Sequence, residues 1–270
     1  MNWEKYRSKV KIFFRYFFPV KDHFKVDFVV AGVQKGGTTA LDYYLRKHSE
    51  VCMGIKKEVH YFDHDHHFRK NKDNYSQYHA NFNPREECKI IGEATPSYIF
   101  WKNAPERIWK YNPAMKIIVI YRDPIERAYS HWNMIRSWNK ENLSFLEALK
   151  AEDLRIKSGR YKETTRFAYR NTGYYGEQLE ELWKYFPKTQ TLLLRNNELR
   201  EQPEKCLQKV SDFLQVGAFQ NIKQKSIHTR EYKSTLETEE LTYLRMAFKD
   251  DMEKFQQMVD WPIDDWLVMN

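Results

Sequence analysis

The stretch from Asp27 to Leu45 constrains the fold most, because it combines a strand, a glycine-containing turn and a helix. Its first part, Asp27 to Ala31, is an apolar, β-rich run that leads into Gly32. After the turn, apolar residues recur with the spacing of one helix face, at Leu41, Tyr44 and Leu45. In such a unit the loop N–H groups and the positive end of the helix dipole point at one place. The sequence therefore predicts a loop that binds a phosphate-like anion.

The turn also matches most of the nucleotide-binding pattern G-x-x-x-x-G-K-[ST]. Gly32, Gly37 and Thr39 occupy their positions, but Thr38 stands where the pattern has lysine. A lysine appears three residues earlier, as Lys35. We therefore expect a phosphate cradle that lacks the usual ATP-binding part.

Three further apolar runs are expected to be buried strands: 89–91, 115–121 and 191–194. Helical patterns lie between and after them, including a capping box at Ser144–Glu147 that opens a helix through about Ile156. Strands that alternate with helices indicate an α/β fold, a parallel sheet with helices on both faces. Ligands of such sheets bind at the carboxyl ends of the strands, where the glycine loop lies.

A second candidate element begins where the run 115–121 ends. Arg122 would reach the sheet edge, Asp123 has the character of a helix N-cap, and Pro124 suits the first helical position. Arg127 and Ser130 are then i, i+3 neighbours on the new helix. An arginine and a hydroxyl so placed can bind a second phosphate. An ordinary capped turn with a surface arginine explains the same residues.

The segment 56–67 is rich in histidine and acidic residues. A metal site is one interpretation, but the residues match no known ligand spacing, and adjacent His66 and His67 do not converge easily on one ion. A polar loop without a metal is the favoured interpretation. Glu58 and His60 lie two apart in an alternating segment and would face the same way on a strand. Either is a candidate general base beside a substrate hydroxyl.

The net charge limits the kinds of partner to be expected, and the cysteine content limits the kinds of compartment. A formal charge of +8 and a pI near 9.1 favour anionic ligands. The basic residues are scattered and match no nucleic-acid-binding motif, so we expect no nucleic-acid partner. Cys52, Cys88 and Cys206 are odd in number and widely spaced, which predicts free thiols in a reducing compartment.

The N-terminal residues 1–25 mix basic and aromatic side chains and lack the features of a signal peptide. They form either a lead-in helix packed on the domain, which we favour, or a peripheral contact with an anionic membrane. No apolar run reaches the length of a membrane span. We expect residues 26–270 to form a single domain.

Taken together, these residues resemble sulfotransferases that use 3′-phosphoadenosine-5′-phosphosulfate (PAPS). Residues 34–39 are similar to the 5′-phosphosulfate loop of that family, and 122–130 to its 3′-phosphate element. Residues 57–63 resemble the segment that carries the catalytic glutamate in heparan sulfate sulfotransferases. Supporting similarity at 93–98, 171–187 and 241–267 extends the resemblance over roughly residues 25–270.

The resemblance implies a role for each matching residue. Residues implied to bind the cofactor are Lys35, Gly36, Gly37, Thr38, Thr39, Arg122, Ser130 and, from a basic closing loop, Arg230. Lys35 would steady the leaving group and Glu58 would be the base, with His60 in reserve. Two departures stand out: Ala94 replaces a lysine usual in heparan sulfate enzymes, and the region of Lys223, Lys225 and Arg230 lacks the glycine of the closing loop.

The expected activity is metal-free, in-line transfer of a sulfuryl group to an acceptor hydroxyl, with adenosine 3′,5′-bisphosphate as the product. A carbohydrate acceptor is favoured, although a lipid or a small metabolite would also fit. The alternatives are a P-loop kinase or NTPase and a non-catalytic nucleotide-binding module. Because the chain has no membrane anchor, a soluble, bacterial-type enzyme in the cytoplasm is expected.

Overall fold

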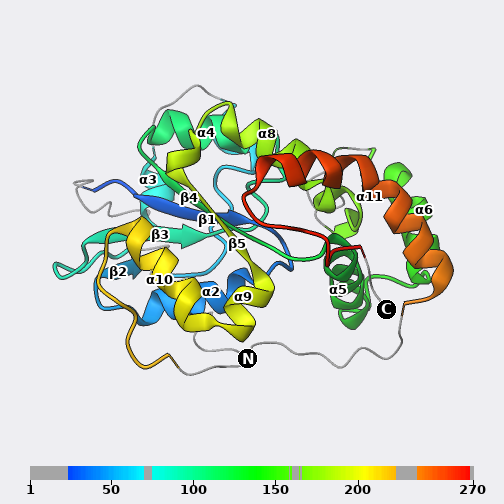
Figure 1. The fold of residues 1–270 in the computed structure, drawn as a ribbon. Helices are drawn as coiled ribbons and strands as arrows, with labels where there is room; N and C mark the ends of the chain where they lie inside the picture. The colour runs from blue at the N-terminus through cyan, green and yellow to red at the C-terminus, as the bar shows by residue number, and fades with distance from the viewer. Residues whose placement is uncertain are drawn as a thin grey trace.

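Five parallel strands form the centre of the fold, in the order β2-β3-β1-β4-β5 (Figure 1). The computed structural model describes residues 24–69, 75–157, 159, 164, 166–222 and 236–267. The strands are β1 (Phe28–Gly32), β2 (Val51–Met53), β3 (Ile90–Ala94), β4 (Lys116–Tyr121) and β5 (Thr191–Arg195). Because all neighbouring pairs are parallel, the five carboxyl ends lie along one edge.

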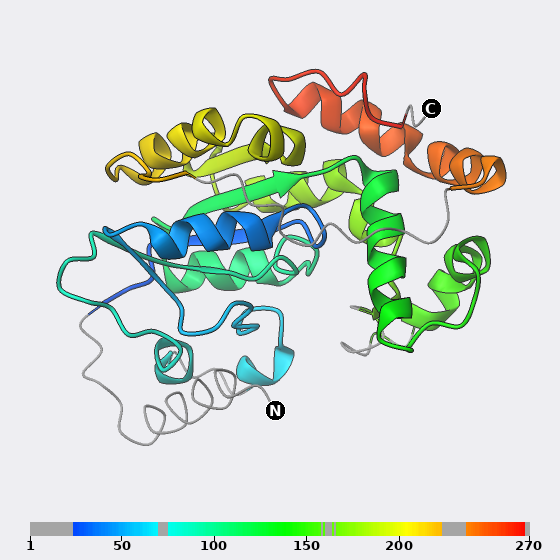
Figure 2. The same ribbon diagram turned by 90° about the horizontal axis from the view of Figure 1, so that it is seen from below.

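Helices cover both faces of the sheet (Figures 1 and 2). On one side lie α2 (Thr38–Lys47), α9 (Asn196–Glu201) and α10 (Pro203–Leu214). On the other lie α4 (Ala104–Tyr111) and α8 (Tyr175–Trp183). At one end of the sheet, α5 (Pro124–Ser137), α6 (Phe145–Ile156) and α11 (Thr238–Met258) extend the second layer. Short elements complete the order: η1 (Asp65–His67), α3 (Ser76–His79), η2 (Asn171–Gly173) and η3 (Lys188–Gln190).

The strand residues alternate between two hydrophobic cores. In β1, Phe28 and Val30 belong to the core shared with α2, α9 and α10, whereas Val29 and Ala31 belong to the core shared with α4, α5, α8 and α11. Strand β4 divides its side chains in the same way. A strand buried on both faces is typical of a parallel sheet, and this explains the continuous apolar runs.

The expected α/β fold is confirmed, together with four of its strands. The capping box at Ser144 and Glu147 begins α6, and Asp123 caps α5 as expected. Strand β2 was missed because it is only three residues long. The strand expected to carry Glu58 and His60 is wrong, because both residues have positive φ angles, 64° and 56°, in a loop.

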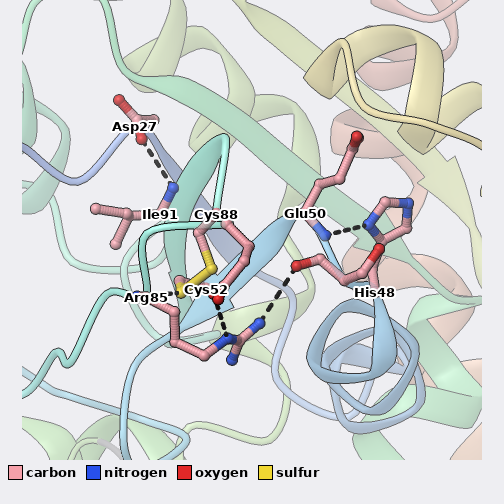
Figure 3. The surroundings of a disulfide bond; sticks show 9 residues. Asp27, His48, Glu50, Cys52, Arg85, Cys88 and Ile91 are labelled. Atoms are coloured by element: carbon pink, nitrogen blue, oxygen red, sulfur yellow. Dashed lines mark hydrogen bonds and ion pairs between the residues drawn. A yellow bond between two sulfur atoms is a disulfide. The ribbon is translucent and has the colours of Figure 1, made fainter.

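The expectation of three free thiols is wrong for two of the cysteines. Cys52 in β2 and Cys88 before β3 form a disulfide across 36 residues (Figure 3). The parallel register explains this pairing, because Cys52 lies opposite Ile91, and Cys88 follows a turn that returns the chain to the same strand pair. Cys206 is free and buried.

In the part of the chain that the structure describes, no helix combines the length and the apolar character needed to cross a membrane. Of the lead-in segment 1–25, residues 1–23 lie outside the described residues.

Candidate functional site

The loop between β1 and α2 has the shape of a phosphate cradle. It turns back on itself where the N–H of Gly36 donates to the carbonyl of Val33, and the N–H of Val33 donates to Ile120 in β4. A Cβ atom on Gly36 would lie 2.3 Å from the carbonyl oxygen of Ile120. Gly37 has a φ of 113°, which side chains rarely permit. Both glycines are therefore required by the fold of the loop.

The first turn of α2 is open to an anion. Gly37 is its N-cap, and no side chain caps the helix. The first turn also carries no acidic residue and begins with Thr38 and Thr39. Uncapped N–H groups and the positive helix end both favour a negative ligand. The four residues expected from the sequence, Gly36, Gly37, Thr38 and Thr39, are thus brought together.

Lys35 reaches across from this loop to α5. Its Nζ lies 3.7 Å from Sδ of Met134, and its backbone has a positive φ of 68°. The contact places the Lys35 ammonium group between the phosphate cradle and the helix that carries Ser130. The lysine displaced in sequence thus reaches α5 rather than standing at the start of α2.

Arg122 and Ser130 lie on the neighbouring β4–α5 connection. The Nε of Arg122 is 2.8 Å from Glu126, and the Arg122 carbonyl accepts a hydrogen bond from the hydroxyl of Tyr175. Ser130 is buried two turns along α5. Arg127 is fully buried and donates to the carbonyl of Tyr169. It therefore supports α5 from inside, and only Arg122 and Ser130 stay as candidate ligands.

Glu58 and His60 face each other, although the backbone is not a strand. The Oε2 atom of Glu58 lies 3.6 Å from Nε2 of His60, and Oε1 lies 2.6 Å from Nζ of Lys57. The other ring nitrogen of His60, Nδ1, lies 2.8 Å from Asp63. Asp63 also accepts a 2.5 Å hydrogen bond from Ser97. The result is a row of carboxylate, imidazole and carboxylate.

This row sets the charges of its members. Burial lowers the pKa of His60, but hydrogen bonds to Asp63 and Glu58 outweigh it and raise the pKa to about 9. Burial raises the pKa of Glu58, but His60 and Lys57 outweigh it and lower the pKa to about 2. At neutral pH the imidazole is therefore a cation and the Glu58 side chain, 44% exposed, is a carboxylate.

One cleft joins the two loops. It has a volume of about 540 Å³, and its lining includes Glu58, His60 and Gln34 of the phosphate loop. Trp138, Lys140 and Arg166 also line it, and we call this aromatic and basic part of the lining the rim. A substrate in this cleft would touch the base candidates and the phosphate loop at once.

A second hollow of about 300 Å³ lies on the other side of Arg122. Asn196, at the start of α9, lines it and also packs against Gly37, where a Cβ would meet Asn196 Nδ2 at 2.3 Å. Trp266 of the C-terminal segment also lines it. This hollow therefore adjoins the phosphate loop at the position of Gly37.

Several of these residues were missed or misassigned by sequence reasoning. Asp63 was considered only as a metal ligand, although its spacing of three from His60 was a usable signal. Asn196 directly follows β5 and Ser97 lies three residues after β3, so their position at strand ends could have identified them. Among the described residues, no group of three or more His, Cys, Asp or Glu side chains is arranged to hold a metal ion. Arg230, with Lys223 and Lys225, lies outside the described residues.

Comparison with known proteins relates the chain to sulfotransferases. The chain is 31% identical over 187 residues to heparan sulfate glucosamine 3-O-sulfotransferase 5 of Mus musculus, covering 69% of this chain and 52% of that protein. It is 37% identical over 118 residues to the membrane-associated sulfotransferase kil1 of Dictyostelium discoideum, covering 44% and 25%. The chain thus spans about half the length of the first relative and a quarter of the second.

A similar fold occurs in the crystal structure of a sulfotransferase from Alicyclobacillus acidocaldarius. The TM-score is 0.77 at 23% sequence identity, and the match covers 90% of this chain and 99% of that one. The family model described as the sulfotransferase domain matches residues 25–266. That match includes the phosphate loop, the Glu58 loop and the β4–α5 connection, and the chain therefore belongs to the sulfotransferase family.

Proposed function

We propose that this protein transfers a sulfuryl group from PAPS to a hydroxyl of a carbohydrate acceptor. The observation that carries the proposal is the shared cleft, in which Gln34 of the phosphate loop and the Glu58–His60 pair line one volume of about 540 Å³. In-line transfer requires a donor group and a base at opposite ends of one reaction line. Because both loops line one cleft, they support this arrangement.

The donor would lie along the carboxyl edge of the sheet. The N–H groups of the phosphate loop, with Thr38 and Thr39, would hold the 5′-phosphate. Lys35 would contact the oxygen that bridges phosphate and sulfur and would stabilise the charge of the leaving group. Arg122 and Ser130 would hold the 3′-phosphate, in which case Arg122 exchanges Glu126 for the ligand. Arg230 stays a further predicted ligand of that phosphate.

Glu58 is the proposed base, and His60 its positioning partner. With a pKa of about 9, His60 is already protonated at neutral pH and has no site for the acceptor proton. Glu58 is ionised, but its pKa of about 2 makes it a weak base while Lys57 is paired with it. An acceptor hydroxyl that displaces Lys57 from Oε1 would raise the proton affinity of Glu58 when it is needed.

The carbohydrate acceptor is supported by the rim of the cleft and by the named relatives. Trp138 has 55% of its surface exposed, and a flat exposed indole beside a cleft can stack on a sugar ring. The Mus musculus relative is named for sulfation of heparan sulfate glucosamine. A lipid or a small metabolite has no comparable support on the rim.

The two other function classes make different predictions. A kinase or NTPase needs a lysine at position 38, where this chain has threonine. A non-catalytic nucleotide-binding module does not need the row formed by Glu58, His60 and Asp63 beside the cradle. Neither class accounts for both loops.

Two measurements test the proposal. Calorimetry should give tighter binding of adenosine 3′,5′-bisphosphate than of ATP, without a magnesium requirement. Transfer of labelled sulfate from PAPS should then occur to at least one glycan in a panel that also contains lipid and small-molecule hydroxyls. Preference for ATP would contradict the donor assignment, and donor binding without transfer to any acceptor would favour a binding module.

The disulfide bears on the compartment in which the domain folds. The cytoplasmic location was expected from free thiols, and the Cys52–Cys88 bond removes that argument. Structural disulfides persist in oxidising compartments. We therefore propose that the domain matures in an oxidising environment, with residues 26–270 as one domain and 1–25 as a lead-in segment.

A further inference from the structure

The loop that carries Glu58 and His60 has an unfavourable backbone conformation. Both residues have positive φ angles, 64° and 56°, and neither is glycine. Such conformations cost free energy and persist where the surrounding structure holds them. The question is which side chains hold this loop, since the segment from Gly54 to His64 contains no helix or strand.

Two hydroxyl groups bind successive N–H groups of the loop. The Oγ1 atom of Thr95 accepts from the N–H of Val59 at 3.0 Å and lies 3.5 Å from that of His60. The hydroxyl of Tyr98 accepts from the N–H of Tyr61 at 3.1 Å. These hydrogen bonds therefore hold the peptide N–H groups that immediately follow Glu58.

Both hydroxyls are oriented by one buried carboxyl group, Glu93 in β3. Thr95 donates to its Oε2 at 2.6 Å, and Tyr98 donates to its Oε1 at 2.9 Å. A third hydroxyl, that of Tyr78, donates to the same Oε1 at 2.9 Å. Glu93, Thr95, Tyr78 and Tyr98 all have no exposed surface. Because each hydroxyl donates its hydrogen bond to Glu93, the lone pairs of Thr95 and Tyr98 are free to accept from the N–H groups of the loop.

We propose that Glu93 is a positioning residue, which acts through Thr95 and Tyr98 to hold the Glu58–Tyr61 backbone in the conformation that aims Glu58 and His60 into the cleft. The inference rests on the proposed function, in which Glu58 is the base. Glu93 itself is buried in β3 and lines no part of the cleft.

The arrangement provides its own control. Tyr78 donates to the same carboxyl oxygen as Tyr98, but the hydroxyl of Tyr98 alone of the two accepts from a loop N–H. Tyr98→Phe and Thr95→Val each remove a hydroxyl that holds the loop, whereas Tyr78→Phe removes a similarly buried one that does not. Thr95→Ser keeps the hydroxyl and is the conservative variant. Glu93→Gln replaces one acceptor oxygen with an NH₂ group of the same size.

The experiment combines amide exchange with steady-state kinetics. In Tyr98→Phe, Thr95→Val and Glu93→Gln, we expect the N–H groups of residues 59–61 to exchange about tenfold faster than in the unmodified protein. We expect kcat to fall about 10–100-fold, because a base misplaced by an ångström loses much of its effect. Affinity for adenosine 3′,5′-bisphosphate should be unchanged, since the phosphate loop is held by Val33 and Ile120 instead.

Tyr78→Phe and Thr95→Ser should stay close to the unmodified protein in all three measurements. The proposal is overturned if Tyr78→Phe is as damaging as Tyr98→Phe, if Thr95→Ser does not restore kcat, or if exchange at 59–61 is unchanged. Loss of nucleotide binding in the Thr95→Val or Tyr98→Phe protein would also overturn it, because the effect would not be local. Amide exchange needs no turnover, so a protein that transfers no sulfuryl group contradicts the proposed function while the exchange pattern still judges the positioning role.

Discussion

The phosphate loop and the loop of Glu58 lie beside the same cleft but are built in opposite ways. In the phosphate loop, glycines occupy the two tightest positions and a local bond from Gly36 to Val33 closes the turn, although Lys35 also has a positive φ and Val33 also donates to Ile120 in β4. In the Glu58 loop, non-glycine residues hold positive φ angles, and the bonds come from Thr95 and Tyr98, 36 and 37 residues away. A local motif therefore encodes the first loop, and only the packed core holds the second. The two halves should respond independently to substitution.

The largest effect is expected from Glu58→Gln. Loss of the general base should lower kcat by about 10²–10⁴-fold while binding of adenosine 3′,5′-bisphosphate is retained. Steady-state sulfation and calorimetry on the same protein measure both quantities. Near-native turnover would show that Glu58 is not the base. Glu198→Gln, on α9 outside the cleft, is the matched control.

Lys35→Ala should affect the phosphate loop rather than the Glu58 loop. Removing the cation beside the leaving group is expected to reduce kcat by about 10²–10³-fold. The pKa of Glu58 should not move, because its partners are Lys57 and His60. Lys47→Ala, at the far end of α2, is the control, and equal losses in the two variants would contradict the assigned role of Lys35.

The disulfide belongs to the base-bearing half, since it closes a loop of 36 residues that contains Glu58, His60 and Asp63. The double substitution Cys52→Ser/Cys88→Ser should lower the free energy of unfolding by about 2–4 kcal/mol. Denaturant unfolding measures this change. Cys206→Ser, at the buried free thiol, is the control for loss of a sulfur atom alone. If nucleotide affinity fell more than kcat, the conclusion that the phosphate loop and the Glu58 loop are independent would be contradicted.

The smallest effect is a change in titration. Asp63→Asn removes the main partner that raises the pKa of His60, so this pKa should fall from about 9 by at least about one unit. Because the folded pKa lies above the ordinary value of 6.5, the pairing stabilises the protein below pH 6.5 and this contribution is lost between pH 6.5 and 9. The variant should therefore lose less stability than the unmodified protein over that range. NMR titration of the His60 ring checks the pKa, and an unchanged value would mean that Glu58 alone sustains it.

Much of the fold was predictable because it depends on patterns within short segments. The apolar runs at 115–121 and 191–194 became β4 and β5, and Asp123 and Pro124 began α5. Strand β2 could not be predicted in this way, since three residues carry too little periodicity. The Cys52–Cys88 pairing depends on β2 lying beside β3, so it could not be predicted once β2 was missed.

The candidate site was predictable to the same degree. Spacing predicted the loop with Gly37, Thr38 and Thr39, and the family resemblance added Gly36, because a glycine turn followed by a helix start is recognisable within a short segment. Glu58 and His60 were identified as chemical candidates, but their expected strand geometry was wrong. The row through His60 to Asp63, and the charges that follow from it, required the folded loop.

The sequence by itself determined the parallel α/β sheet, the phosphate loop and the identity of the residues at its edge. Hydrophobic patterns and glycine spacing extend over only a few residues, so they can be recognised in the amino-acid sequence alone. Only the tertiary structure decided that Lys35 crosses to α5, that His60 is held between two carboxylates, and that Glu93 lies beneath the base-bearing loop. Lys35 and Met134 are 99 residues apart, and Thr95 and Tyr98 are 36 and 37 residues from the N–H groups that they bind. The contacts of His60 are short in sequence, but they require a loop conformation and a burial that exist only after the core has formed.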